Sequence, residues 1–270
     1  MTANEAERRR WNDEGWAAAW PKREVLTDAI TPYLLDALAL QPGERVLDVG
    51  SGGGKATIAA ARAVGPSGTA VGADISRPLT KLATRRAAEA EVTNVSFCVA
   101  DVQHEQPTGG PFDVVMSQFG VMFFDDSLAA FTNIRAQLES EGRIAFACWQ
   151  TADRNPWFVA AALVGIIPPL PPSEPGQSPV GPFALGEPER TQGILEAAGF
   201  AHVSRDAYDL APEVPHDALI DDAQLVRMGV PPEKMAEATE AVNDHLAKFA
   251  SRPGLAKFPL AFQIFQATAR

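Results

Sequence analysis

The chain has 270 residues, of which 46% are apolar, and its formal net charge is −11. This length is sufficient for one large domain that carries an insertion. The acidic balance argues against a nonspecific nucleic-acid binder, because such a protein needs a basic face to displace counterions from phosphates. We therefore expect a small-molecule substrate and no nucleic-acid partner.

No window of the sequence approaches the roughly 18 consecutive apolar residues of a membrane span. Residues 1–12 are polar and charged, unlike a signal peptide. We therefore expect no membrane span and a cytoplasmic location. Cys98 and Cys148 lie in apolar runs and are predicted to be buried free thiols. No Cys/His cluster has metal-ligand spacing, so no metal is expected. Monomer and homodimer both stay open.

The first half of the chain predicts an N-terminal cap followed by a regular alternation of strands and helices. Residues 1–40 read as helices. The expected strands are 45–49, 69–73, 95–99, 112–117 and 143–149, and the expected helices between them are 55–64, 79–90 and 127–138. Such alternation predicts parallel strands with right-handed crossovers. The fold class is therefore a Rossmann-like, doubly wound α/β sheet, with its core over residues 41–152.

The second half is less regular. Prolines and glycines crowd residues 153–190, which we expect to form a loop and lid. Residues 191–270 are expected to complete the sheet, with a helical insertion at about 216–250. Within that part, residues 261–268 are predicted as an antiparallel edge strand. We further expect residues 155–188 and the helical insertion to cover the substrate together.

The most informative segment is 46–54, with the sequence Val-Leu-Asp-Val-Gly-Ser-Gly-Gly-Gly. It predicts a buried strand, a glycine turn and the start of a helix at the carboxyl edge of the sheet, where such folds bind ligands. Glycines let the backbone approach a ligand closely, and the helix start favours a carboxylate or phosphate. Asp74 ends the next strand, where a carboxylate can accept both ribose hydroxyl protons. This pattern indicates a cofactor that contains adenosine.

Three details favour S-adenosylmethionine over NAD. The dinucleotide fingerprint needs a glycine where this chain has Lys55. Asp48 precedes the turn, where an acid suits an ammonium group better than a pyrophosphate. Asp101 follows the third strand and can accept from the adenine amine, while Val102 packs on the ring. The alternative is that Asp74 and Asp101 only cap turns or helices.

Residues 40–150 resemble a class I S-adenosylmethionine-dependent methyltransferase. The 46–54 run and the Phe-Asp-Val-Val run at 112–115 are similar to those of the ubiquinone/menaquinone-biosynthesis methyltransferase group. The resemblance implies a seven-stranded, mainly parallel sheet whose last strand is antiparallel, with S-adenosylhomocysteine as the product. It implies a cofactor site made of Asp48, Gly50, Ser51, Gly52, Gly54, Asp74, Ile75, Ala100, Asp101, Val102 and Gln118. Of these, Gln118 matches a position that lines the methyl-transfer face.

Methyl transfer from a sulfonium is an in-line displacement, in which the protein mainly positions the partners and excludes water. An aromatic pocket suits this reaction, because aromatic faces also attract the sulfonium. The candidates for the acceptor pocket are Trp20, Phe119, Phe123, Trp149 and Trp157. None of the four histidines ends a strand of the sheet core. We therefore assign no catalytic acid or base; His104 is the nearest candidate.

Two other functions compete with a small-molecule methyltransferase. An NAD(P)-dependent oxidoreductase would need a Tyr/Lys pair or another hydride-transfer constellation, yet neither Tyr33 nor Tyr208 has a lysine four residues later. A non-catalytic protein could retain this fold as a binding module, although it would not need the acidic and glycine residues above. A nucleic-acid methyltransferase is disfavoured because Ser-Gln-Phe-Gly at 117–120 replaces the Asn/Asp-Pro-Pro-Tyr/Phe motif.

Overall fold

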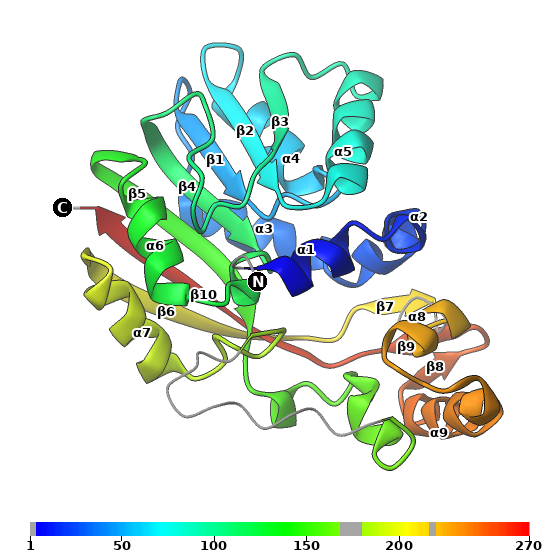
Figure 1. Cartoon of the computed structure of the whole chain (residues 1–270). Helices are drawn as coiled ribbons and strands as arrows, with labels where there is room; N and C mark the ends of the chain where they lie inside the picture. Colours follow the sequence, from blue (N-terminus) through cyan, green and yellow to red (C-terminus); the bar gives the residue numbers. More distant parts are fainter. Residues whose placement is uncertain (1–3, 168–179, 216–219, 270) are drawn as a thin grey trace.

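A computed structural model describes residues 4–167, 180–215 and 220–269 (Figure 1). Its helices are α1 (Glu5–Trp11), α2 (Glu14–Arg23), α3 (Thr31–Leu38), α4 (Lys55–Val64), α5 (Arg77–Glu89), α6 (Ser127–Arg135), α7 (Pro188–Ala197), α8 (Asp222–Arg227) and α9 (Met235–Ala247). Its strands are β1 (Arg45–Val49), β2 (Thr69–Asp74), β3 (Val95–Val99), β4 (Phe112–Gln118), β5 (Leu138–Trp149), β6 (Phe200–Leu210), β7 (Glu213–Pro215), β8 (Ala250–Arg252), β9 (Leu255–Lys257) and β10 (Leu260–Ala269).

The main sheet has the predicted fold class. Within the described ranges it holds seven strands in the order β3-β2-β1-β4-β5-β10-β6. Strands β1 to β5 pair in parallel, whereas β10 runs antiparallel to both β5 and β6. Strand order reverses beside β1, so the segments that follow β1 and β4 meet at the carboxyl edge, where ligands bind in such sheets.

The prediction that the last strand lies at an edge is wrong. β10 lies between β5 and β6, and β6 forms the edge. The cause is visible in the burial of side chains: eight of the ten residues of β10 are buried, whereas β6 is mostly exposed or half-buried. A strand that is apolar on both faces belongs in the interior of a sheet, with neighbours on both sides.

Helices cover both faces of this sheet (Figure 1). α3 packs on β5, β4 and β10, and α4 packs on β1 and β2, while α6 and α7 pack together on the other side, with α7 against β6. The Ala-rich α4 approaches the strands closely, because Ala60 and Ala61 are fully buried. α5 begins at Arg77, two residues before the expected start, with Ser76 as its N-cap, since the Ser76 side chain accepts a hydrogen bond from Leu79 N–H.

Two groups of elements lie outside this core. α1 and α2 form the expected N-terminal helices, and α8 and α9 belong to the expected insertion (Figure 1). A three-stranded sheet, β7-β9-β8, flanks these two helices in the sequence, and the sequence analysis did not predict it. Residues 168–179 and 216–219, in the expected lid and insertion, lie outside the described residues. Among the helices that the structure describes, none has the length and apolar character needed to cross a bilayer.

The two cysteines differ in their surroundings. Both are free thiols. Cys148 is fully buried in β5, and burial raises its pKa to about 12. Cys98 is only half-buried, so the expectation of two buried thiols is correct for one of them. Burial, followed by the charge of Glu105, raises the pKa of Cys98 as well.

The turns after β1 and β4 contact one another through glycines. A Cβ at Gly50, where φ is +72°, would lie 2.6 Å from Gly120 Cα, and one at Gly120 would lie 2.5 Å from Val49 O. We therefore expect Gly50→Ala and Gly120→Ala each to lower the free energy of unfolding by on the order of 1–3 kcal/mol. Urea denaturation measures this quantity.

Gly193, in the middle of α7, is the matched control. A Cβ there would meet no atom within 4 Å. Gly193→Ala is therefore expected to raise the free energy of unfolding by about 0.5–1 kcal/mol. Equal stabilities for all three variants would contradict the close contact between the two turns.

Candidate functional site

A cavity of about 320 Å³ opens at the carboxyl edge of the sheet, below the N-terminal helices. It lies beyond the ends of β1, β2, β3 and β4. The predicted site residues all line it: Asp48, Gly50, Ser51, Gly52, Gly54, Asp74, Ile75, Ala100, Asp101, Val102, Gln118, Trp20, Phe119, Phe123, Trp149 and Trp157. The structure thus brings together residues that are up to 137 positions apart in the sequence (20 to 157). Which part of a ligand each one contacts stays a prediction.

Asp48 lies at the bottom of this cavity and is 1% exposed. Thr57 Oγ1, on the first turn of α4, donates a 2.6 Å hydrogen bond to Asp48 Oδ2. Oδ1 is buried and has no hydrogen-bond partner among the described residues. Burial raises the pKa of Asp48 to about 7; the bond from Thr57 lowers it and the charge of Asp74 raises it further. This carboxyl group therefore titrates near neutral pH and presents a free oxygen to a ligand.

Asp74 joins the turn after β1 to the turn after β2. Its Oδ2 accepts a 2.7 Å hydrogen bond from Gly52 N–H, and its Oδ1 accepts one of 2.7 Å from Ser76 N–H. Burial raises the pKa of Asp74 to about 6, although both backbone bonds lower it. A carboxylate oxygen has two lone pairs, so each of these two oxygens can accept one further hydrogen bond from a ligand. Asp74 therefore supports the shape of the glycine turn in addition to any role in binding.

Asp101 is held by the start of α1. Its Oδ1 accepts hydrogen bonds from Asn4 Nδ2 at 3.0 Å and from Gln103 N–H at 3.2 Å. Arg8 lies 3.6 Å from its Oδ2. His104, the nearest candidate for a base, follows in the same turn but does not line the cavity; its Nε2 lies 3.1 Å from Gln103 Nε2. The structure therefore gives His104 no position facing a ligand in this cavity.

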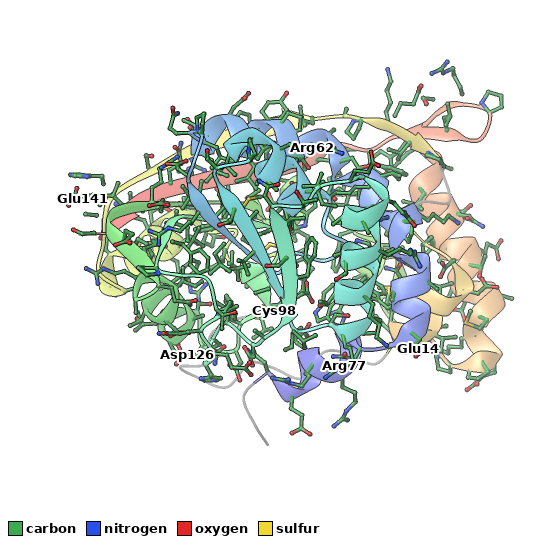
Figure 2. All side chains as sticks on the ribbon, turned by 90° about the horizontal axis from the view of Figure 1, so that it is seen from above. Glu14, Arg62, Arg77, Cys98, Asp126 and Glu141 are labelled. Atoms are coloured by element: carbon green, nitrogen blue, oxygen red, sulfur yellow. The ribbon has the colours of Figure 1, made fainter. Side chains whose placement is uncertain are left out.

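The other end of α1 binds the turn after β2. Asn12 Nδ2 donates to Ile75 O at 3.0 Å, and Arg77 N–H donates to Asn12 Oδ1 at 3.0 Å. Ser76 Oγ donates to Trp11 O at 2.6 Å. Figure 2 shows the labelled Arg77 beside the ribbon of α1. α1 therefore crosses over the ends of β2 and β3 and is anchored on both sides.

The five predicted aromatic residues divide into two groups. In the first, Phe119 stacks on Trp149 with ring centroids 4.1 Å apart, and Trp157 packs on Trp149 at 4.9 Å. Phe119 adopts φ +62°, a strained conformation for a residue other than glycine. Asn155 fixes Trp157, because its Oδ1 accepts from Trp157 Nε1 at 2.9 Å.

The second group of rings gathers around Trp11. Phe123 packs edge-on against Trp11 at 5.2 Å, and Trp20 packs edge-on against the same ring at 6.2 Å. Trp20 lies on the glycine turn, since a Cβ at Gly52 would be 2.9 Å from its ring. The predicted aromatic residues therefore form two separate groups of rings, whereas the sequence analysis expected one aromatic pocket.

Gln118 ends β4 and is bound to the N-terminal part of the chain. Its Nε2 donates to Thr27 O at 3.1 Å, and its Oε1 accepts from Thr31 Oγ1 at 2.9 Å. The side chain thus faces the cavity in a fixed orientation.

Several cavity residues were missed by the sequence analysis: Asn4, Trp11, Trp16, Met122, Phe124, Phe158, Val159, Pro182, Gln224 and Met228. Most lie on α1, α2, α8 and the segment after β5, which follow no motif with a fixed position relative to the glycine turn. For the segment after β5, the sequence analysis named Trp157 alone, and Trp157 lines the cavity.

Comparisons with known proteins agree with this geometry. A family model described as a methyltransferase domain matches residues 40–164. The chain is 30% identical to a nocamycin O-methyltransferase from Saccharothrix syringae over 85% of this chain and 87% of that protein. It is 34% identical to the aklanonic acid methyltransferase DauC from Streptomyces sp. over 57% of this chain and 64% of that protein.

A solved methyltransferase from Aquifex aeolicus has the same fold. Its TM-score is 0.54 at 15% identity, with 98% of both chains covered. The resemblance predicted from the glycine and Phe-Asp-Val-Val runs is therefore confirmed. The chain belongs to the class I S-adenosylmethionine-dependent methyltransferases and is an enzyme of that type.

Proposed function

We propose that the enzyme transfers the methyl group of S-adenosylmethionine to an oxygen of an apolar small molecule, which binds against Phe119, Trp149 and Trp157. One observation carries this proposal: the residues predicted for the cofactor and those predicted for the acceptor line a single cavity. S-adenosylmethionine supplies an already activated methyl group, so the residues of the chain need only hold two partners in line and exclude water.

The residues around the cavity suit this cofactor. Asp48 Oδ1 is a buried acceptor that lacks a partner in the described structure, and the ammonium of the cofactor would supply the missing donor. Asp74 would accept from the ribose hydroxyls, and Asp101 from the adenine amine. Val102 and Ala100 are buried and apolar beside them, as an adenine ring requires.

The acceptor would lie against the first group of rings, formed by Phe119, Trp149 and Trp157. Apolar side chains from three further parts of the chain line the same cavity: Met122 from the turn after β4, Phe158 after β5, and Met228 after α8. The names of the two relatives support a small-molecule acceptor, and the name of one supports transfer to oxygen. Neither name identifies the acceptor of this enzyme.

Described parts of the expected lid contribute to the same wall. Trp157, Phe158 and Pro182 line the cavity, as does Gln224 from the insertion. Arg23 at the end of α2 pairs with Asp221 at the start of α8 at 3.2 Å, which ties the N-terminal helices to the insertion. We propose that these segments, together with the cap of α1 and α2, enclose the acceptor.

Thermal denaturation with three ligands tests the cofactor. S-adenosylmethionine and S-adenosylhomocysteine are each expected to raise the melting temperature by several degrees, whereas NADH is expected to leave it unchanged. A ligand at a hundred times its dissociation constant stabilises a protein by about 2.7 kcal/mol, and 1 kcal/mol corresponds to about 2–4 °C for a chain near this size.

The other outcomes separate the competing functions. A shift with NADH alone would contradict the proposal in favour of an oxidoreductase. No shift with any of the three would favour a non-catalytic module. A shift with both adenosyl compounds justifies the next step, which is to measure the transfer of labelled methyl groups to a panel of aromatic hydroxy and carboxylic acids.

A further inference from the structure

We propose that the indole N–H of Trp20 donates a hydrogen bond to the carboxylate of bound S-adenosylmethionine. Trp20 would then be a cofactor-binding residue rather than part of the acceptor wall. The inference rests on the proposed function, because it needs that cofactor in this cavity. It adds a contact from an N-terminal helix to the contacts expected from the glycine turn.

The indole ring of Trp20 lies against the glycine turn. α2 places Trp20 directly on the turn that follows β1. A Cβ at Gly52 would lie 2.9 Å from Trp20 Cζ2, and a Cβ at Gly53 would lie 2.8 Å from Trp20 Nε1. Only glycines leave room for the indole here, and its N–H edge rests on Gly53 itself.

The indole N–H group of Trp20 has no hydrogen-bond partner among the described residues. Trp20 Nε1 is buried and makes no hydrogen bond to any described residue, and the same is true of Ser51 Oγ and Asp48 Oδ1. Buried polar atoms are normally paired, so unpaired atoms on Asp48, Ser51 and Trp20, at and beside the glycine turn, point to a missing ligand. An indole N–H can only donate and a carboxylate oxygen can only accept. Together they complement the carboxylate and the ammonium of an amino acid.

The charged side chains beside the glycine turn form ion pairs with one another. The basic groups beside the turn are already paired with acids: Lys55 Nζ lies 2.8 Å from Asp28 Oδ2 and 3.2 Å from Glu24 Oε1. Arg86 Nη1 donates to Glu24 Oε2 at 2.9 Å and to Gly53 O at 3.0 Å. With these charges balanced, recognition of a carboxylate falls to uncharged N–H donors.

The start of α4 supplies further donors of this kind. α4 begins at Lys55, and no side chain caps its N-terminus. The first N–H groups of a helix lack partners within the helix and attract anions. The indole of Trp20 therefore stands over a backbone region that already favours a carboxylate.

The test compares two ligands that differ only in the carboxylate. Dissociation constants of S-adenosylmethionine and its decarboxylated form are measured for the wild type and for Trp20→Phe, which keeps a ring but removes the N–H. Trp20→Phe is expected to weaken S-adenosylmethionine binding about ten- to a hundredfold, the range for a hydrogen bond to a charged group. The affinity for decarboxylated S-adenosylmethionine is expected to stay within about twofold of the wild type, because that ligand has no group for the indole to bind.

Trp11→Phe is the matched control. Trp11 belongs to the same group of rings, but its Nε1 already donates to Glu7 Oε2 at 2.7 Å. The loss of this N–H should change the affinities of both ligands by the same factor. A ring substitution that only loosens the N-terminal helices would behave in the same way.

Nuclear magnetic resonance gives a second readout that does not depend on affinity. The chain has five tryptophans, so five indole N–H signals are expected, and the one lost in Trp20→Phe identifies Trp20. This signal should move downfield on binding S-adenosylmethionine or S-adenosylhomocysteine and should not do so with the decarboxylated ligand.

The outcomes are distinct. If Trp20→Phe weakens both ligands equally, or neither, while the wild type binds S-adenosylmethionine, Trp20 does not contact the carboxylate and the inference is wrong. If the wild type binds neither ligand, the proposed function itself fails.

Discussion

Asp74→Ala is expected to weaken S-adenosylmethionine binding by about 2–3 kcal/mol, which corresponds to about a 30- to 150-fold loss of affinity. The reason is that the carboxylate of Asp74 stands at the end of β2, where it would accept hydrogen bonds from both ribose hydroxyls. Isothermal titration calorimetry with wild type and variant measures the change.

Asp74 also has a structural role, which the sequence did not indicate. Asp74 also accepts Gly52 N–H and Ser76 N–H, each at 2.7 Å. Asp74→Ala leaves both donors without this partner, so the variant should melt several degrees lower even without ligand. A loss of affinity in this variant alone would therefore not separate a ribose contact from a distorted glycine turn.

A modified ligand separates a ribose contact from a distorted glycine turn. S-adenosylhomocysteine without its two ribose hydroxyls should bind the wild type more weakly than the intact ligand does. In Asp74→Ala the two ligands should bind equally, because the group that distinguishes them is gone. An undiminished preference for the intact ligand in a folded variant would mean that the ribose lies elsewhere.

The parts of the fold that were predicted correctly are those with a local signal. The helix at 55–64 and the strands at 45–49 and 95–99 have the predicted bounds, because each is an apolar run between turn residues. The position of β10 was not predictable from the run alone, although its apolar residues on both faces were an indication that it lies inside the sheet.

The residues of the site also divide into those with a local signal in the sequence and those without one. Asp48 lies near the end of β1, Asp74 ends β2 and Asp101 follows β3. Parallel strands bring their carboxyl ends together, so the sequence predicts these three residues in one cavity. Asn4 and Trp20 reach that cavity from helices whose docking depends on tertiary contacts. For Trp20, the sequence indicated that the side chain lines the cavity. Only the contact with Gly52 and Gly53 shows that the ring lies on the glycine turn.

Binding of S-adenosylmethionine is expected to weaken about tenfold for each pH unit below about 7, because Asp48 must be ionised to pair with the ammonium of the cofactor. Burial raises the pKa of Asp48 to about 7, so the protein without cofactor holds a proton there that it must release on binding. Titration calorimetry at pH 6 in buffers of different ionisation enthalpy should show the release of close to one proton, and at pH 8 almost none.

The raised pKa of Asp48 makes the protein without cofactor less stable as the pH rises, whereas it makes cofactor binding tighter. The pKa of Asp48 in the folded protein is above its ordinary value of 3.8, so the unfolded chain loses this proton first as the pH rises. The free energy of unfolding without cofactor therefore falls between about pH 4 and pH 7. Asp48→Asn cannot ionise, so at pH 8 it should be more stable than the wild type and bind the cofactor more weakly.

Two variants distinguish Asp48 from its neighbour Asp74, whose pKa is raised to about 6. Asp48→Asn should remove the decline in affinity between pH 7 and pH 6. Thr57→Val removes the hydrogen bond that lowers the pKa of Asp48, so the decline should begin at a higher pH. If the decline persisted unchanged in both variants, the released proton would come from another group, and Asp48 would not be the partner of the ammonium.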